Sequence, residues 1–210
     1  MNKKPSLLII GNSNVGKSSI TRLLLPNVKL YKGKSGKKPG STLQIKPISN
    51  NNLSYQIVDL PGFGYMKSPS RRREEHIKKQ IVIHIEKHYN DYFFGLVVIN
   101  ILRIEDEIRK YFLQSKKTIP LSFELIQFLS EFNIPLLIIL NKIDKVSNFD
   151  KHKIIKLLVN SAKEYGLNLI SFDEFNIENK TETPFLEFSA LKKMNLDKLK
   201  QIIKKYLEFF

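Results

Sequence analysis

The chain has 210 residues, of which 42% are hydrophobic, so it is long enough to bury one sizeable core and is not a disordered tail. It contains no cysteine, which excludes disulfides and thiolate metal sites and suits a reducing cytoplasm. The net charge of +15 has two readings, a polyanionic partner such as RNA or DNA or a lysine-rich composition. Apolar runs such as 135–140 are too short to span a membrane, so we expect a cytoplasmic protein without a membrane partner.

Strand and helix patterns alternate along the chain. Short apolar runs predict strands, and apolar residues at helical spacing predict helices. Two lysine- and arginine-rich segments, 29–41 and 66–73, are expected to be loops, and 168–180 is expected to be a surface insertion. The expected strands are 7–11, 42–48, 53–58, 95–100, 134–141 and 183–190, and the expected helices are 17–25, 74–89, 103–117, 120–132, 148–167 and 195–210.

This alternation predicts an α/β fold with a six-stranded, mostly parallel sheet and helices on both faces. The two strands joined at 49–52 would form a hairpin that adds one antiparallel edge strand. No repeat or linker divides the chain, so we expect a single domain over residues 1–210 and a monomer.

The segment "GNSNVGKSS" at 11–19 matches the Walker A pattern and stands between a predicted strand and a predicted helix. Gly11 and Gly16 let the backbone bend so that its N–H groups surround phosphates, and the helix directs its positive end towards them. Lys17 would contact the β- and γ-phosphates, and Ser18 would bind magnesium.

Two further segments continue this site. Thr42, in "PGST", could give magnesium a second hydroxyl, although a plain Pro-Gly turn is the alternative. Asp59 ends a predicted strand, where its carboxylate could hold a magnesium-bound water. Gly62, in "DLPG", could bring its backbone N–H to the γ-phosphate.

The segment "NKID" at 141–144 follows a predicted strand, at the sheet edge where α/β folds bind ligands. Asp144 can accept hydrogen bonds from guanine N1–H and N2–H, which adenine does not offer, so the pattern disfavours an ATPase. Asn141 and Lys142 would brace the loop and cover the base, and "FSA" at 188–190 could present N–H groups to guanine O6.

In this order, "GNSNVGKSS", "KPGST", "DLPGFGYM", "NKIDK" and "FSALKKMNLDKL" resemble the TRAFAC class of P-loop GTPases, and more narrowly the EngB family in its archaeal form. The resemblance implies a Ras-like GTPase fold, GTP and GDP binding with magnesium, and a role in large ribosomal subunit assembly and normal cell division. Asn12 and Asn100 depart from the family pattern, which often has Arg and Asp there.

Hydrolysis requires an oriented water, and "GFGYM" offers no glutamine for that purpose. A slow enzyme completed by a partner surface is one reading. In the other reading, Asn14 binds a potassium ion that assists hydrolysis. Asn14 resembles the P-loop asparagine of cation-dependent TRAFAC GTPases, although asparagine is also a common turn residue.

The two basic segments flank "PGST" and "DLPG" and could bind ribosomal RNA in the GTP state, unless they are only a solvated basic surface. The competing hypothesis is a nucleotide-dependent interaction protein of cell division, with incidental hydrolysis. The candidate catalytic residues are Lys17, Thr42 and Asn14, and the candidate metal ligands are Ser18, Thr42 and Asp59. The candidate nucleotide-binding residues are Gly11, Asn12, Ser13, Asn14, Val15, Gly16, Lys17, Ser18, Ser19, Pro39, Gly40, Ser41, Thr42, Asp59, Leu60, Pro61, Gly62, Asn141, Lys142, Asp144, Phe188, Ser189 and Ala190.

Overall fold

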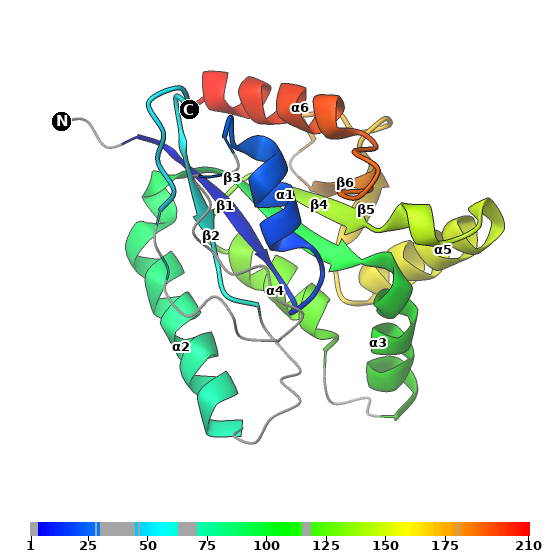
Figure 1. Cartoon of the computed structure of the whole chain (residues 1–210). Coiled ribbons are helices and arrows are strands. Elements are labelled where there is room, and N and C mark those ends of the chain that lie inside the picture. The colour runs from blue at the N-terminus through cyan, green and yellow to red at the C-terminus, as the bar shows by residue number, and fades with distance from the viewer. Residues whose placement is uncertain are drawn as a thin grey trace.

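The computed structural model describes residues 4–27, 29, 45, 47–62, 71–114, 119–179 and 181–210, without the side chains of 71–74 and 111–114. Strands and helices alternate within it as the sequence predicts (Figure 1). The strands are β1 (Ser6–Gly11), β2 (Gln56–Asp59), β3 (Tyr92–Asn100), β4 (Leu136–Asn141), β5 (Asn168–Ser171) and β6 (Glu182–Phe188). The helices are α1 (Lys17–Leu24), α2 (Arg71–His88), α3 (Ile101–Gln114), α4 (Leu121–Ser130), α5 (Asn148–Glu164) and α6 (Leu196–Glu208), with 3-10 turns at Tyr89–Asp91 and Ile143–Lys145.

The six strands form one sheet in the order β2-β1-β3-β4-β6-β5. Every neighbouring pair of these strands is parallel, which confirms the doubly wound architecture. The expected antiparallel edge strand is represented in the described residues by a single bridge, in which Ile48 and Ile57 exchange two backbone hydrogen bonds. The rest of that expected strand falls largely outside the described residues, so it stays a prediction.

Alternate residues of the strands point to two separate cores. On one face Leu8, Val97 and Ile138 pack against α2, α3, α4 and α5. On the other face Leu7, Val98 and Ile139 pack against α1, drawn in front of the sheet in Figure 1, and α6, drawn along the top. Since both faces are covered, the central strands read as continuous apolar runs in the sequence.

The segment 168–180, expected to be a surface insertion, begins with a strand, so that expectation was wrong for its first four residues. β5 pairs in parallel with β6 and closes one edge of the sheet. Of its four residues only Leu169 is buried. A strand this short and this exposed carries no periodic hydrophobic signal.

Two local expectations also need correction. Residues 71–73, expected in a loop, lie in the first turn of α2, which fits the helix propensity of arginine. Asn195 stands at the N-cap of α6 as expected, but its φ of 60° and the direction of its side chain prevent it from capping the helix. Its Nδ2 donates instead to the backbone oxygen of Glu187, 2.8 Å away.

The register of the sheet brings the ends of four strands to one edge. Gly11 of β1 is level with Val98 of β3, Asn100 of β3 with Asn141 of β4, and Asn141 with Phe188 of β6. The loops that leave these carboxyl ends therefore meet above the same edge, where open α/β sheets bind ligands. Within the described ranges, no helix is long and apolar enough to cross a membrane.

Candidate functional site

The phosphate-binding loop connects β1 to α1 and ends at Gly16, the N-cap residue of the helix. Gly16 has a φ of +108°, and a Cβ at this position would lie 2.2 Å from Nδ2 of Asn141. Both the backbone conformation and the close approach of Asn141 therefore require glycine. The conformation of the loop therefore depends on Asn141, a residue of the segment predicted to bind the guanine base, as well as on the loop's own sequence.

Lys17 lies at the base of this loop and is 8% exposed. Its Nζ donates to the backbone oxygens of Gly11 and Asn12, at 2.9 Å each. Burial lowers the pKa of Lys17 to about 8, and the nearby carboxylate of Asp59 opposes that shift. The loop thus holds a desolvated ammonium group ready to pair with an anion.

Ser18 and Asp59 bring two oxygen atoms together beside Lys17. Ser18 Oγ lies 3.5 Å from Asp59 Oδ2, across the gap between α1 and the end of β2. A hydroxyl and a carboxylate are hard oxygen donors of the kind magnesium prefers, and magnesium commonly takes one or two protein ligands together with waters and phosphate oxygens. In the part of the chain that the structure describes, no group of three or more His, Cys, Asp or Glu could hold a metal ion, so this pair is the candidate.

Gly62, the last described residue of "DLPG", lies directly against the phosphate loop. A Cβ on Gly62 would approach the Cα and Oγ of Ser13 to 2.8 Å and its backbone nitrogen to 2.9 Å. Ser13 Oγ is buried and has no hydrogen-bond partner among the described residues. The segment that follows Asp59 is thereby placed within contact distance of the loop predicted to bind phosphates.

Asn141 joins the phosphate loop to the opposite side of the site. Its Nδ2 donates to the backbone oxygen of Val15 at 2.8 Å, and its Oδ1 accepts from the backbone N–H of Ala190 at 3.0 Å. The side chain is 2% exposed, so both bonds are shielded from water. One amide therefore fixes three loops relative to one another.

Asp144 and Lys142 occupy the same loop. Asp144 Oδ1 accepts from the buried hydroxyl of Ser189 at 2.5 Å, and Ser189 Oγ accepts in turn from the backbone N–H of Lys192 at 3.0 Å. Lys142 has a φ of 72°, and its Nζ donates to the backbone oxygen of Asn14 at 2.7 Å. Burial lowers the pKa of Lys142, helped by the charge of Arg103 and opposed by Asp144. These contacts hold a carboxylate at a defined place beside the phosphate loop.

Three comparisons bear on this arrangement. Residues 6–142 match the model of a family described as 50S ribosome-binding GTPase. The chain belongs to this GTPase family. A probable GTP-binding protein EngB from Pyrococcus horikoshii is 30% identical over 94% of this chain and 82% of its own length. A probable GTP-binding protein EngB from Methanococcus aeolicus is 34% identical over 76% of this chain, and the match spans 66% of that protein's own length.

A solved structure supports the same assignment. The crystal structure of a probable GTP-binding protein EngB is 28% identical, with a TM-score of 0.76 over 98% of this chain and all of the other. The chain therefore belongs to the EngB family of GTP-binding proteins, with their Ras-like GTPase fold.

Several candidate residues of this EngB chain fall outside the described residues. They are Pro39, Gly40, Ser41 and Thr42, and the segment that follows "DLPG" at 63–66 also lies outside the described residues. The remaining candidates lie around one edge of the sheet, and their nucleotide contacts stay predictions. Asn100 lies outside the candidate set. Its Oδ1 accepts from the backbone N–H of Leu102 at 3.2 Å, at the start of α3.

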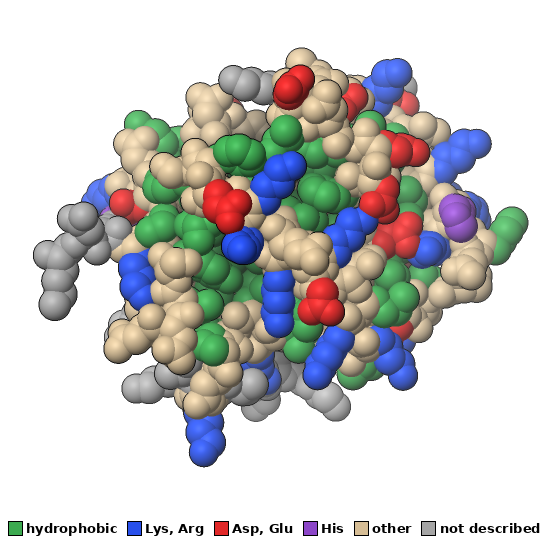
Figure 2. Space-filling model, turned by 90° about the horizontal axis from the view of Figure 1, so that it is seen from above, with side chains coloured by type: hydrophobic (Ala, Val, Ile, Leu, Met, Phe, Trp, Pro, Cys, Tyr) green, Lys and Arg blue, Asp and Glu red, His purple; other side chains and the backbone are tan. Residues whose placement is uncertain are grey.

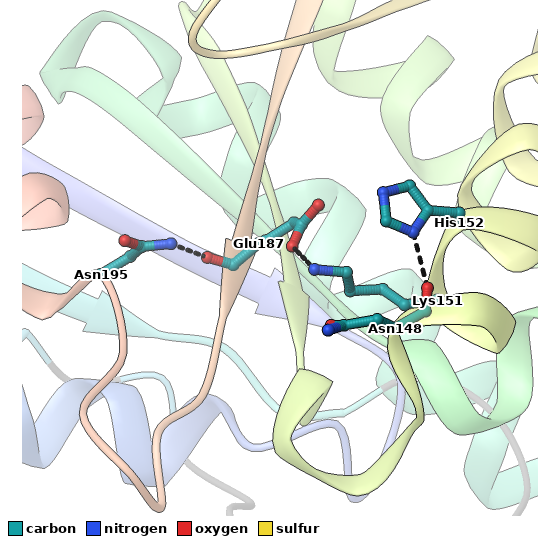
Figure 3. A network of polar contacts seen from close by, with 5 residues as sticks. All are labelled: Asn148, Lys151, His152, Glu187 and Asn195. Atoms are coloured by element: carbon teal, nitrogen blue, oxygen red, sulfur yellow. Dashed lines mark hydrogen bonds and ion pairs between the residues drawn. The ribbon is translucent and has the colours of Figure 1, made fainter.

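A polar network behind the base-side loops was missed from the sequence (Figure 3). Lys151, one turn into α5, pairs with Glu187 of β6 at 2.6 Å. Asn195 donates to the backbone oxygen of the same Glu187, and Nδ1 of His152 lies 2.6 Å from the backbone oxygen of Asn148. Glu187 stands two residues before Ser189, so the network anchors the loop that holds Asp144. The contacts of Glu187 with Lys151 and Asn195 join separate elements, so no local pattern signals them, whereas His152 and Asn148 are four residues apart in α5.

Proposed function

We propose that this EngB chain binds GTP and GDP, hydrolyses GTP slowly and acts as a molecular switch in the assembly of the large ribosomal subunit, with a link to normal cell division. The observation that carries the nucleotide assignment is Asn141, which hydrogen-bonds to both Val15 and Ala190. This amide couples a loop suited to phosphates to a carboxylate suited to guanine. We also propose that residues 1–210 form one GTP-binding domain, which the single sheet of all six described strands supports, and that the protein is a cytoplasmic monomer.

In this proposal Asp144 accepts hydrogen bonds from guanine N1–H and N2–H. The carboxylate already has its Oδ1 fixed by Ser189. Adenine would leave the second oxygen of Asp144 covered by the base but without a donor, at a cost of about 1–3 kcal/mol or more for a charged group. Ser189 and Ala190 would present their backbone N–H groups towards guanine O6, and Lys142 would cover the base.

Magnesium would be held by Ser18 and Asp59, with Thr42 as a further hydroxyl ligand in the GTP state. The oxygens of Ser18 and Asp59 already lie 3.5 Å apart, which suits ligands of one small cation or of its bound water. The metal would supply neutralisation of phosphate charge. Lys17 would turn its ammonium group to the β- and γ-phosphates, and Gly62 would offer its N–H to the γ-phosphate.

The slow rate follows from the sequence after "DLPG", which lacks a glutamine. Asn14 is the candidate potassium ligand, because it lies in the phosphate loop with an exposed side chain, while its φ of 64° suits the alternative of a plain turn residue equally well. Turnover should be higher in potassium than in sodium at equal ionic strength, and Asn14→Ala should remove the difference. Equal rates in both salts, with and without ribosomes, would contradict the potassium proposal.

The charge distribution supports a polyanionic partner at the nucleotide side. Residues 1–73 hold 14 Lys and Arg but one acidic residue, Asp59, whereas residues 74–210 hold 21 Lys and Arg and 19 acidic residues. Lysine-rich composition alone would spread the excess over the whole chain. The face seen in Figure 2 carries both signs side by side. On α6, Lys204 pairs with Glu208 and Lys198 pairs with Asp173. The excess therefore belongs to the part of the sequence that carries "GNSNVGKSS", "PGST" and "DLPG".

The test of the switch is co-sedimentation with large-subunit precursor particles in a GTP analogue, in GDP and without nucleotide. We expect binding mainly in the GTP state. Equal binding in all three conditions would contradict a switch. Binding in none of them would contradict the ribosomal role and favour the interaction protein of cell division.

Salt dependence tests the RNA contact separately. Each phosphate contact should contribute about 0.7–0.9 to the slope of log affinity against log salt. Replacing the arginines at 71–73 by alanine should lower this slope. Replacing Lys200, Lys204 and Lys205 on the mixed-charge face of α6 removes the same charge and should leave it unchanged. Binding that does not vary with salt would contradict an RNA contact.

A further inference from the structure

Glu107 of α3 is a carboxylate that none of the roles above uses. The helix places Ile101, Ile104 and Ile108 in the core, and Glu107 follows on the same side, partly shielded from solvent. Burial raises the pKa of Glu107, and hydrogen bonds from Ser122 and Asn12 oppose that shift. A desolvated carboxylate is costly to keep unless such bonds satisfy it.

The two oxygens of Glu107 reach two different parts of the molecule. Oε2 accepts from Nδ2 of Asn12, in the phosphate loop, at 3.2 Å. Oε1 accepts from the backbone N–H of Ser122, in the first turn of α4, at 2.8 Å. The second contact places a negative charge at the N-terminus of α4, where N–H groups lack partners within the helix.

Asn12 is held through both its side chain and its backbone. Its side chain is bonded to Glu107, and its backbone oxygen accepts from Lys17, the ammonium group proposed to bind phosphates. Its Oδ1 is buried without a partner among the described residues, so the bond to Glu107 is the side-chain contact that fixes this residue. A change in the position of Glu107 would therefore be transmitted to the backbone that carries Lys17.

We propose that Glu107 is a positioning residue that couples the docking of α3 and α4 to the geometry of the phosphate loop, and through it to nucleotide affinity. The inference rests on the proposed nucleotide binding. Coupling of this kind is reciprocal, so bound nucleotide must also stabilise the contact between Glu107 and α4. A partner that displaces α3 or α4 would then loosen the nucleotide without touching it.

Nucleotide affinity is the first test. Glu107→Ala should weaken GDP binding about tenfold, in line with the loss of a hydrogen bond to a charged group. Asn12→Ala should have a similar effect, and the double variant should be no weaker than either single one, because both remove the same contact. Glu107→Gln should stay within about twofold, since its amide can donate to Asn12 Oδ1 after that side chain turns over and still accept from Ser122.

A matched control lies on the same helix. Glu105 is also a carboxylate of α3, but it is bonded to Arg109 at the surface. Glu105→Ala should leave GDP affinity unchanged. Losses that multiply in the double variant, or unchanged affinity in Glu107→Ala, would overturn the proposal.

Amide exchange at Ser122 separates positioning from simple capping of α4. In the wild type GDP should slow exchange of this amide, and in Asn12→Ala it should not. If exchange of the Ser122 amide in the wild type does not depend on GDP, Glu107 only caps α4 and the proposed coupling is contradicted. If neither the wild type nor any variant binds guanine nucleotide, the proposed function itself fails, which is a different result from binding without coupling.

Discussion

The two halves of the candidate site differ in how completely their polar groups are bonded. On the base side the side chains of Asn141 and Ser189 and one carboxylate oxygen of Asp144 are engaged in contacts of 2.5–3.0 Å, and the second oxygen of Asp144 is the acceptor proposed for guanine. On the phosphate side Ser13 Oγ and Asn12 Oδ1 are buried without partners among the described residues, and Ser18 stands 3.5 Å from Asp59. The base side is therefore a rigid frame, whereas the phosphate side retains hydrogen-bonding capacity. This is the division expected where one half identifies a ligand and the other half changes with its charge.

The largest loss of GDP affinity should come from a change at Gly16, where the phosphate loop contacts Asn141 of the base side. Gly16→Ala would place a Cβ 2.2 Å from Asn141 Nδ2, at a φ of +108°. We expect GDP affinity to fall by about 100-fold or more, because the bonds of Asn141 to both loops are displaced. Isothermal titration calorimetry measures this.

Gly166→Ala is the matched control. Gly166 has a φ of +76°, but a Cβ there would meet nothing within 4 Å. This variant should cost stability of about 1 kcal/mol from backbone strain and leave GDP affinity unchanged. If Gly16→Ala and Gly166→Ala lose the same GDP affinity, the contact between Gly16 and Asn141 does not determine nucleotide binding.

The next effect is the pH dependence of the phosphate side. Burial lowers the pKa of Lys17 to about 8, and a phosphate would raise it again. Affinity for GDP should be constant below pH 8 and should fall above it, by up to about tenfold per pH unit, because the neutral amine must first take up a proton. Fluorescent GDP titrations from about pH 7 to 8.5 test this, a range in which guanine N1–H stays largely protonated.

Lys142 provides the control for that experiment, because its pKa is also lowered. Lys142→Met should retain the slope above pH 8. A flat profile in the wild type, or a slope that vanishes in Lys142→Met, would contradict the assignment to Lys17. Unfolding stability has the opposite sign: because the pKa of Lys17 is lower in the folded state, its charge opposes folding at neutral pH, and stability should rise with pH above 8.

Gly62 gives a smaller and more selective effect. In Gly62→Ala the new Cβ would press on the Cα, nitrogen and Oγ of Ser13. The segment that carries Gly62 would have to move away from the loop and would lose its N–H contact with the γ-phosphate, so we expect a GTP analogue to bind about three- to tenfold more weakly and GDP to lose less. Adding Ser13→Gly should restore little, because the Cα and nitrogen contacts at 2.8 and 2.9 Å remain. Equal losses for GTP and GDP would contradict a role in γ-phosphate sensing.

The smallest effect should come from the network behind the base loops. Lys151→Met removes the bond to Glu187, whose side chain is 31% exposed, so solvent reduces its value. We expect GDP affinity to fall about two- to threefold without a change in base selectivity. Lys204→Met, which removes the exposed contact with Glu208, is the control and should have no effect.

The sequence predicted the elements with strong local signals. The apolar runs of β1, β3 and β4 are buried from end to end, and the helix after "GNSNVG" begins at Lys17 as expected. The order of motifs was enough to predict that the loops after β1, β4 and β6 meet at one edge. The register of a parallel sheet makes that meeting unavoidable.

The features that escaped prediction depend on contacts between distant segments. β5 is held by pairing with β6 rather than by its own pattern, and Glu107 reads as one more polar residue of an amphipathic helix. Asn195 has the side chain of an N-cap, but the loop geometry directs it to Glu187. In each case the deciding partner lies elsewhere in the sequence.

The proposal that the base side reads guanine through Asp144 has a direct test. Asp144→Asn retains an oxygen that can accept from Ser189 but exchanges the other carboxylate oxygen for an N–H donor. Competition binding of GDP and the xanthosine diphosphate analogue to wild type and Asp144→Asn should show a reversal, with GDP weakened about 100-fold and the xanthosine nucleotide preferred. Unchanged preference for GDP in Asp144→Asn would contradict the account.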